Sequence, residues 1–332
     1  MRNRNIRKAV QVGLCCAVAM SVVATRALAS EWPNRAITLI IPFGAGSATD
    51  LVGRLIAAPM ADALGEPVVV QDVGGAAGLI GVSKAAKADP DGYTVVMGGV
   101  DTFAQVKWLR KNPPYDPVKD FEPVGLAVIQ PLLLTTRKEL PVSNLKEFAA
   151  YLHANQSKMQ YASSGVGSAP HLACSRLLTA MGAKVTHVSY RGSAQAMQDV
   201  LAGNIDFYCP IASSAVSLMK SKSLKAMAIL TEQRSPILPD LPTAKEQGFD
   251  ICENVYWMAF FVPKGTPADI VTKLNLALNK ALDTPNVQMR LRDMAGTVVG
   301  PARRSPKYLS SFLASETKSW GVTIKAAGVQ PN

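Results

Sequence analysis

Two loops of small residues follow apolar stretches in the two halves of the chain, at residues 43–50 and 163–171. The first reads Phe-Gly-Ala-Gly-Ser-Ala-Thr-Asp and the second Ser-Ser-Gly-Val-Gly-Ser-Ala-Pro-His. Small side chains leave backbone N–H groups uncovered, and a helix that starts after such a loop adds further N–H groups and its positive end. Two loops of this kind predict a site that holds a small carboxylate from both sides.

The predicted ligand-binding residues lie in these loops and in nearby glycine-rich or strand-end segments. Ser47 and Asp50 have the spacing of a capping box, and Ser168 precedes Ala-Pro as an N-cap residue would. Capping is compatible with ligand contact, because a capped helix end still presents other N–H groups. The full set is Phe43, Gly44, Ala45, Gly46, Ser47, Asp50, Gly75, Ser163, Ser164, Gly165, Gly167, Ser168, His171, Tyr190, Arg191 and Asp206.

Several of these residues have a structural alternative. Phe43 ends an apolar stretch, so it either forms an aromatic wall for the ligand or fills the core. Arg191 either clamps a second carboxylate in bidentate fashion or lies solvated on a loop. Asp206 either anchors a neighbouring loop or receives a ligand donor. Asp50 is expected to orient its loop or meet an ammonium or hydroxyl group, since it would repel a carboxylate.

Ser168 and His171 also raise the hypothesis of an exported hydrolase. A base must lie within hydrogen-bond reach of the nucleophile and be oriented by a third group. The sequence offers neither a GxSxG elbow nor an evident orienting carboxylate, so we predict that the protein is not an enzyme.

Composition excludes several other functions. The three histidines and three of the cysteines, Cys174, Cys209 and Cys252, lack the spacing of a metal or CxxC site, and we predict no metal and no cofactor. The three cysteines are interpreted as buried thiols, with one disulfide plus a free thiol left open. Basic residues are scattered without aromatic interleaving, so nucleic acid is not an expected partner.

The first 29 residues are typical of a signal peptide. A basic start precedes an apolar stretch from about Ala9 to Ala24, and Ala27-Leu28-Ala29 is a small-x-small cleavage site. Cleavage after Ala29 removes five basic residues and lowers the formal net charge from +11 to +6. We therefore expect a protein exported to the periplasm.

Strand-like and helix-like stretches alternate along the rest of the chain, which predicts mostly parallel sheets flanked by helices. A helix is expected over residues 51–64, bent or ended early at Pro59. The chain is expected to build a first domain from residues 30–131 and 254–332 and a second from residues 132–253. Two crossings between these domains would form a hinge, and clefts at domain interfaces are favoured ligand sites.

A series of short motifs along the chain closely resembles the Bug/TctC family, the substrate-binding proteins of tripartite tricarboxylate transporters. The motifs are Trp32-Pro33, Pro42-Phe43 before the first loop, Pro90-Asp91-Gly92-Tyr93-Thr94, Pro114-Tyr115-Asp116-Pro117, Asp120-Phe121, Tyr161-Ala162-Ser163, Gly165-x-Gly167-Ser168, His171-Leu172-Ala173, His187-Val188-x-Tyr190-x-Gly192, Leu238-Pro239-Asp240-x-Pro242-Thr243 and Pro263-x-Gly265-Thr266-Pro267. They occur in the expected order over essentially the whole chain after the signal peptide.

The resemblance implies a two-domain type II periplasmic binding protein, or Venus flytrap, and we expect the protein to be a monomer. It also implies that the protein closes on a small organic carboxylate and delivers it to the permease subunits in the membrane. A receptor that serves a signalling system is the remaining alternative. The run Asp72-Val73-Gly74-Gly75-Ala76-Ala77-Gly78 departs from the family pattern near the expected cleft, so the ligand of a relative does not carry over directly.

Overall fold

The computed structural model describes residues 32–251, 255–326 and 331, and the residues from Arg35 onward form one compact unit. The predicted signal peptide, its cleavage site and Cys252 lie outside the described residues. None of the helices in the described part of the chain combines the length and apolar character needed to cross a membrane.

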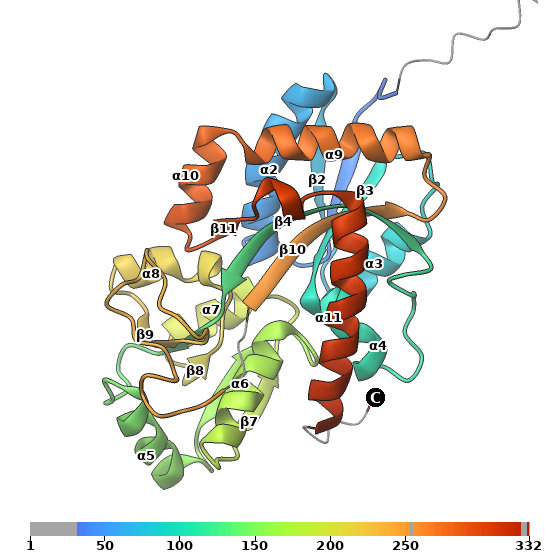
Figure 1. Ribbon diagram of the computed structural model, residues 1–332. Coiled ribbons are helices and arrows are strands. Elements are labelled where there is room, and N and C mark those ends of the chain that lie inside the picture. Colours follow the sequence, from blue (N-terminus) through green and yellow to red (C-terminus); the bar gives the residue numbers. More distant parts are fainter. Residues whose placement is uncertain (1–31, 252–254, 327–330, 332) are drawn as a thin grey trace, which may run out of the picture. The chain divides into compact units, whose positions relative to one another are not determined.

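Six strands form the first sheet, in the order β11-β4-β10-β3-β1-β2 (Figure 1). The inner strands β1 and β3 are parallel, as alternating strands and helices predict, whereas β10 runs antiparallel to both β3 and β4. We call this sheet with its helices the first lobe. Its strands are β1 (Ile37–Ile41), β2 (Val68–Asp72), β3 (Thr94–Gly99), β4 (Phe121–Pro131), β10 (Val255–Pro263) and β11 (Thr297–Val298). Its helices are α2 (Ala48–Leu64), the 3-10 turn η1 (Ala76–Gly78), α3 (Leu79–Ala86), the π-helix η2 (Val100–Gln105), α4 (Val106–Leu109), α9 (Ala268–Leu282), α10 (Pro285–Asp293), η4 (Pro301–Arg303) and α11 (Pro306–Ala326).

Five strands form the second sheet, in the order β7-β6-β8-β5-β9. Strands β6, β7 and β8 are parallel, so their carboxyl ends meet at one edge. We call this sheet with its helices the second lobe. Its strands are β5 (Leu133–Thr136), β6 (Gln160–Ser163), β7 (Thr186–Ser189), β8 (Phe207–Tyr208) and β9 (Lys225–Ile229). Its helices are α5 (Leu145–Asn155), α6 (Ala169–Ala180), α7 (Ser193–Leu201), η3 (Ala212–Ser214) and α8 (Val216–Lys220).

The chain passes from the first sheet to the second between β4 and β5 and returns between β9 and β10. Strands β4 and β10 are antiparallel neighbours along most of their length (Figure 1). This distribution of strands supports the domain boundaries that the sequence suggests, which we keep as a proposal.

Helix α2 extends further along the chain than the proline within it led us to expect. It begins at Ala48 and continues through Pro59 to Leu64, so the early end at the proline is wrong. Its buried face, which includes Val52, Ile56 and Met60, packs in the first lobe, and α9 lies against the helix. Apolar burial of this kind outweighs the single backbone hydrogen bond that a proline removes.

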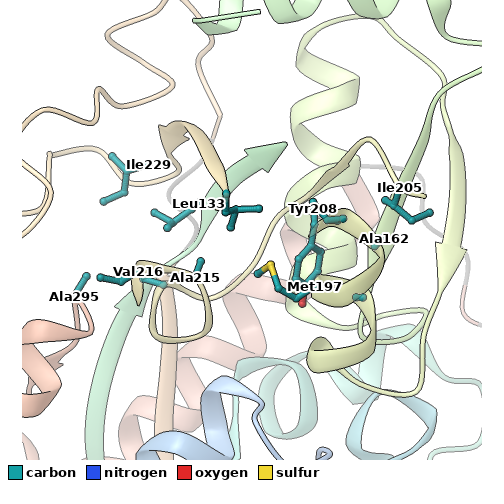
Figure 2. Packing of buried hydrophobic residues seen from close by; sticks show 13 residues of the cluster. Leu133, Ala162, Met197, Ile205, Tyr208, Ala215, Val216, Ile229 and Ala295 are labelled. Atoms are coloured by element: carbon teal, nitrogen blue, oxygen red, sulfur yellow. The ribbon is translucent and has the colours of Figure 1, made fainter. Parts of the chain in front are cut away.

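The core of the second lobe gathers side chains from one face of α7 and from β8, η3 and β9 (Figure 2). A disulfide joins Cys174 in α6 to Cys209, which follows β8. The interpretation of these two residues as free thiols is therefore wrong. Their pairing depends on how α6 packs beside the sheet, which spacing along the chain does not reveal.

Candidate functional site

The first loop ends at the amino terminus of α2, where Ser47 is the N-cap. Its Oγ accepts a hydrogen bond from the Asp50 amide at 3.2 Å, as the capping-box spacing predicts. The amides of Ala48 and Thr49 make no hydrogen bond to any described residue. The positive end of α2 therefore keeps two donors available.

Asp50 points into the loop. Its Oδ2 accepts the Gly46 amide at 2.8 Å, and its Oδ1 accepts Arg54 Nε at 2.6 Å. Arg54 also bridges to Asp72, whose pKa is raised by burial and by the nearby Asp50. Both carboxylate oxygens of Asp50 thus accept hydrogen bonds within the first lobe. This supports a role in orienting the loop rather than in contacting an ammonium or hydroxyl group of the ligand.

The second loop uses most of its own donors. The Gly165 amide donates to Ser163 Oγ at 3.1 Å, the Gly167 amide donates to His171 Nδ1 at 3.2 Å, and the Ser168 amide donates to the Gly165 carbonyl at 3.1 Å. Ser168 Oγ caps α6 by accepting the His171 amide at 3.4 Å. The amides that the sequence assigned to a ligand are therefore largely taken by internal acceptors.

Two neighbouring histidines support this loop from within the second lobe. The rings of His171 and His187 lie 4.2 Å apart, and Tyr161 stacks on His187 at 4.8 Å. His187 Nε2 lies 2.7 Å from Ser163 Oγ. Burial, and then the neighbouring His187, lower the pKa of His171 to about 4. Neutral His171 accepts the Gly167 amide, whereas a protonated ring has no free acceptor there.

Asp101 of η2 connects the two lobes. Its Oδ1 accepts the Thr102 amide at 2.9 Å and the Tyr256 hydroxyl at 3.0 Å, and its Oδ2 accepts the Ala169 amide at 3.4 Å. Burial raises the pKa of Asp101 to about 6, although these hydrogen bonds act to lower it. Helix α6 has no acidic residue in its own first turn, so Asp101 of the first lobe supplies the negative charge that its amino end favours.

The first loop faces the amino end of a third helix, α7, in the second lobe. A Cβ placed on Gly46 would lie 3.7 Å from Ala194 Cβ, and one on Gly192 would lie 3.7 Å from the Gly44 amide nitrogen. The N-cap of α7 is Gly192, which has no side chain to cap the helix, and the Ser193 and Ala194 amides make no hydrogen bond to any described residue. The amino ends of α2 and α7 thus approach each other from different lobes.

The second loop also contacts the first lobe. A Cβ on Gly165, whose φ is +129°, would lie 2.9 Å from the Ala77 amide nitrogen. Gly75 lies in the same first-lobe segment, and its φ is also +129°. The close approach at Gly165 requires glycine and brings the loops at 74–78 and 163–168 together.

The remaining predicted residues are less closely associated with these loops. Phe43 is buried beside Gly78, as the core alternative expects. The Tyr190 hydroxyl donates to Asp199 on α7, and Arg191 is exposed. Asp206 precedes β8, at the amino ends of the strands and opposite to the second loop. Its oxygens accept Arg137 Nε at 3.0 Å and the Gln160 amide at 2.8 Å. Asp206 thus anchors neighbouring segments, as its structural alternative expects, and its contact with a ligand stays a prediction.

Three residues at this junction are absent from the predicted set. The Ala77 amide approaches Gly165, and the Ser193 and Ala194 amides open α7. For α7, Gly192 and Ser193 after the strand at 186–189 were the sequence signal that a helix with uncovered amides begins there. Within the described residues, no group of three or more His, Cys, Asp or Glu side chains is arranged to hold a metal ion.

Other hollows lie away from these loops. One of about 540 Å³ in the second lobe has apolar walls that include Met219, Leu224 and Ile237, with Lys138 and Lys222 among its lining residues. Another, of about 390 Å³, lies where β4 and β10 lead toward the second lobe and is lined in part by Gln130 and Val255.

Comparison with known proteins gives consistent matches over nearly the whole chain. The profile of the Tripartite tricarboxylate transporter family receptor, TctC, matches residues 52–329. The periplasmic binding protein BugD is 36% identical and superposes with a TM-score of 0.88 over 91% of this chain and 100% of BugD. MatC from Rhodopseudomonas palustris, solved with bound malate, is 36% identical, with a TM-score of 0.83 over 88% of this chain and 100% of MatC.

A second R. palustris protein, Rpa4515, was solved with adipate. It is 31% identical, with a TM-score of 0.86 over 91% of this chain and 100% of its own. The two sheets flanked by helices are thus those of a two-domain periplasmic binding protein. The extent of the profile match and the agreement of the folds lead to one conclusion: this chain belongs to the TctC family of tripartite tricarboxylate transporter receptors.

Proposed function

We propose that this protein is an extracytoplasmic solute-binding protein that captures a small organic carboxylate between its two lobes. The observation that carries the proposal is the approach of the amino ends of α2 and α7 from different lobes, at Gly46 and Ala194. Each end keeps amides without a partner among the described residues. A carboxylate between them accepts hydrogen bonds from both lobes and neutralises two positive helix ends.

The family relatives support this class of ligand. MatC was solved with malate and Rpa4515 with adipate, and both are small carboxylates. A micromolar complex requires about 8 kcal/mol. Several charge-assisted hydrogen bonds to the carboxylate, shielded from water by closure of the lobes, supply energy on this scale.

The contact between the lobes supports delivery by opening and closing. Strands β4 and β10 run toward the second lobe, and hydrogen bonds of Asp101, Gln130 and Arg110 also join the lobes, together with the loop contacts. The family implies that the cargo passes to the permease subunits of a tripartite tricarboxylate transporter. Export through a signal peptide cleaved after Ala29, and action as a monomer, belong to the same proposal.

The local geometry favours binding over catalysis. In a Ser–His hydrolase the imidazole must accept the serine hydroxyl proton. Here Ser168 Oγ accepts a hydrogen bond from the His171 backbone amide, and His171 Nδ1 accepts one from the Gly167 amide. The two side chains are therefore arranged as a helix cap and a loop support, and we propose no enzymatic activity.

Calorimetric titration of the chain from Ser30 onward with malate, adipate, butyrate and benzoate tests the proposal. We expect at least one acid to bind and to be recovered unchanged. Ala194→Asp places a negative charge at the amino end of α7 and should weaken that binding at least tenfold while leaving the helix intact, because an acidic residue is favourable there. Gln198→Asp, at an exposed position of the same helix, is the matched control and should bind as the wild type does.

The panel is measured on protein unfolded and refolded to remove any bound solute. If none of the acids binds, and denaturation of the purified protein releases no carboxylate, the proposed function is wrong.

A further inference from the structure

Tyr208 has a buried hydroxyl that lacks a hydrogen-bond partner. It is the last residue of β8, its side chain is 0% exposed, and its hydroxyl makes no hydrogen bond of good geometry to any described residue. A buried polar group without a partner is costly and uncommon in folded proteins. The ring packs beside Met197, and the hydroxyl lies at the edge of the apolar cluster, directed away from Leu133 and Ile229 (Figure 2).

The surroundings of this hydroxyl contain hydrogen-bond donors. Burial raises the pKa of Tyr208 to about 12, whereas the nearby side chains of Ser193 and Ser164 act to lower it. The Tyr208 side chain is therefore a neutral donor at physiological pH. Ser193 opens α7, whose first amides have no partner among the described residues, and Ser164 belongs to the second loop. Three hydroxyls and an uncapped helix end thus converge where Gly192 approaches Gly44 of the first loop.

We propose that the Tyr208 hydroxyl, together with Ser164 and Ser193, binds an oxygen of the captured carboxylate and so determines which acids this receptor holds. The proposal rests on the proposed function and adds the second-lobe part of the same site. The donors are all neutral, so they recognise a carboxylate oxygen through hydrogen bonds and the helix end rather than through an ion pair. Ring size also matters, because Tyr208 closes the apolar side of the subsite and limits how far a ligand extends into the second lobe.

Tyr208→Phe tests this role because it removes one oxygen and keeps the ring. If the hydroxyl serves the ligand, its removal leaves the melting temperature of the protein without ligand unchanged or raised, since an unpaired buried group is lost. The same substitution should weaken binding of malate, adipate or benzoate, whichever the wild type holds, by about tenfold or more. Stability and affinity are therefore expected to change in different directions.

Tyr115→Phe is the matched control. Tyr115 is also buried, but its hydroxyl donates to the Thr102 carbonyl at 2.6 Å, so its removal should lower the melting temperature.

Two outcomes overturn the inference while leaving the proposed function standing. One is unchanged affinity in Tyr208→Phe, and the other is a melting temperature that falls as it does in Tyr115→Phe. If the wild type binds none of the four acids and releases no carboxylate on denaturation, the proposed function itself is wrong, and the proposed subsite is then wrong as well.

Discussion

Asp101 joins the two lobes through buried hydrogen bonds, and its charge is poorly solvated. Its carboxylate meets Tyr256 and Thr102 of the first lobe and the first amide of α6 in the second. Because folding raises the pKa of Asp101 to about 6, the folded protein favours the protonated carboxyl. The stability that this group contributes is present below its unfolded pKa, near 4, and is lost as the pH rises through 6.

Asp101→Asn removes this titration. Between pH 4 and pH 7 the free energy of unfolding of the wild type should fall relative to that of the variant, by on the order of 2 kcal/mol. Urea denaturation at several pH values measures the difference. Asp62→Asn, at an exposed position of α2, is the control and should track the wild type. A constant difference between wild type and Asp101→Asn over this range would contradict the account.

His171 has the opposite effect on the pH dependence of stability, because its folded-state pKa is lowered rather than raised. Its pKa is lowered to about 4, so the folded protein favours the neutral ring. The stability contributed by this residue is complete above the ordinary histidine pKa of about 6.5 and is lost as the pH falls through 4. His171→Asn keeps an acceptor for the Gly167 amide but does not titrate, so it should reduce the loss of stability in acid. His153→Asn, at an exposed position of α5, should not. Equal acid sensitivity in the two variants would contradict the prediction.

At the scale of elements, the close approach of loops from different lobes depends on glycine. At Gly165 a Cβ would meet the Ala77 amide nitrogen at 2.9 Å, and the φ of +129° is itself unfavourable for alanine. Gly203 has a φ of +81° but faces open space. Both substitutions by alanine strain the backbone, whereas only Gly165→Ala pushes the lobes apart.

We therefore expect Gly165→Ala to weaken binding of the carboxylate at least tenfold, and Gly203→Ala to leave binding unchanged. Titration of both variants with the acid that the wild type binds measures the difference. Equal affinities would mean that the second loop does not need to approach the first lobe for capture.

The disulfide between Cys174 and Cys209 closes a segment that contains β7 and α7. The two cysteines are 35 residues apart in sequence, and the chain-entropy estimate for such a loop is about 4 kcal/mol. The double variant Cys174→Ala, Cys209→Ala should lose stability on this scale and become insensitive to reductant during refolding. Urea denaturation with and without reductant tests this. A wild type that is equally stable after full reduction would contradict it.

At the scale of the molecule, local signals in the sequence were reliable. Ser47 and Ser168 cap helices because a cap needs only its own residue and the amide three residues later. The alternation of strand-like and helix-like stretches predicts mostly parallel sheets flanked by helices, and two sheets flanked by helices are present.

What the sequence could not reveal depends on contacts between distant segments. Tyr208 stands in a short apolar strand and is indistinguishable there from a core residue. The role of Asp101 requires the amino end of α6, which lies 68 residues further along the chain. The anchoring of Asp206 by Arg137 depends likewise on strand pairing between β5 and β8. Such roles emerge only when the two sheets are in place.

A crystal structure of the protein with its tightest-binding carboxylate tests the central claim most directly. The account predicts carboxylate oxygens within about 3 Å of amides at the amino ends of α2 and α7, with one of them accepting the Tyr208 hydroxyl. A carboxylate bound to one lobe only, or in the hollow lined by Lys138 and Lys222, would contradict it.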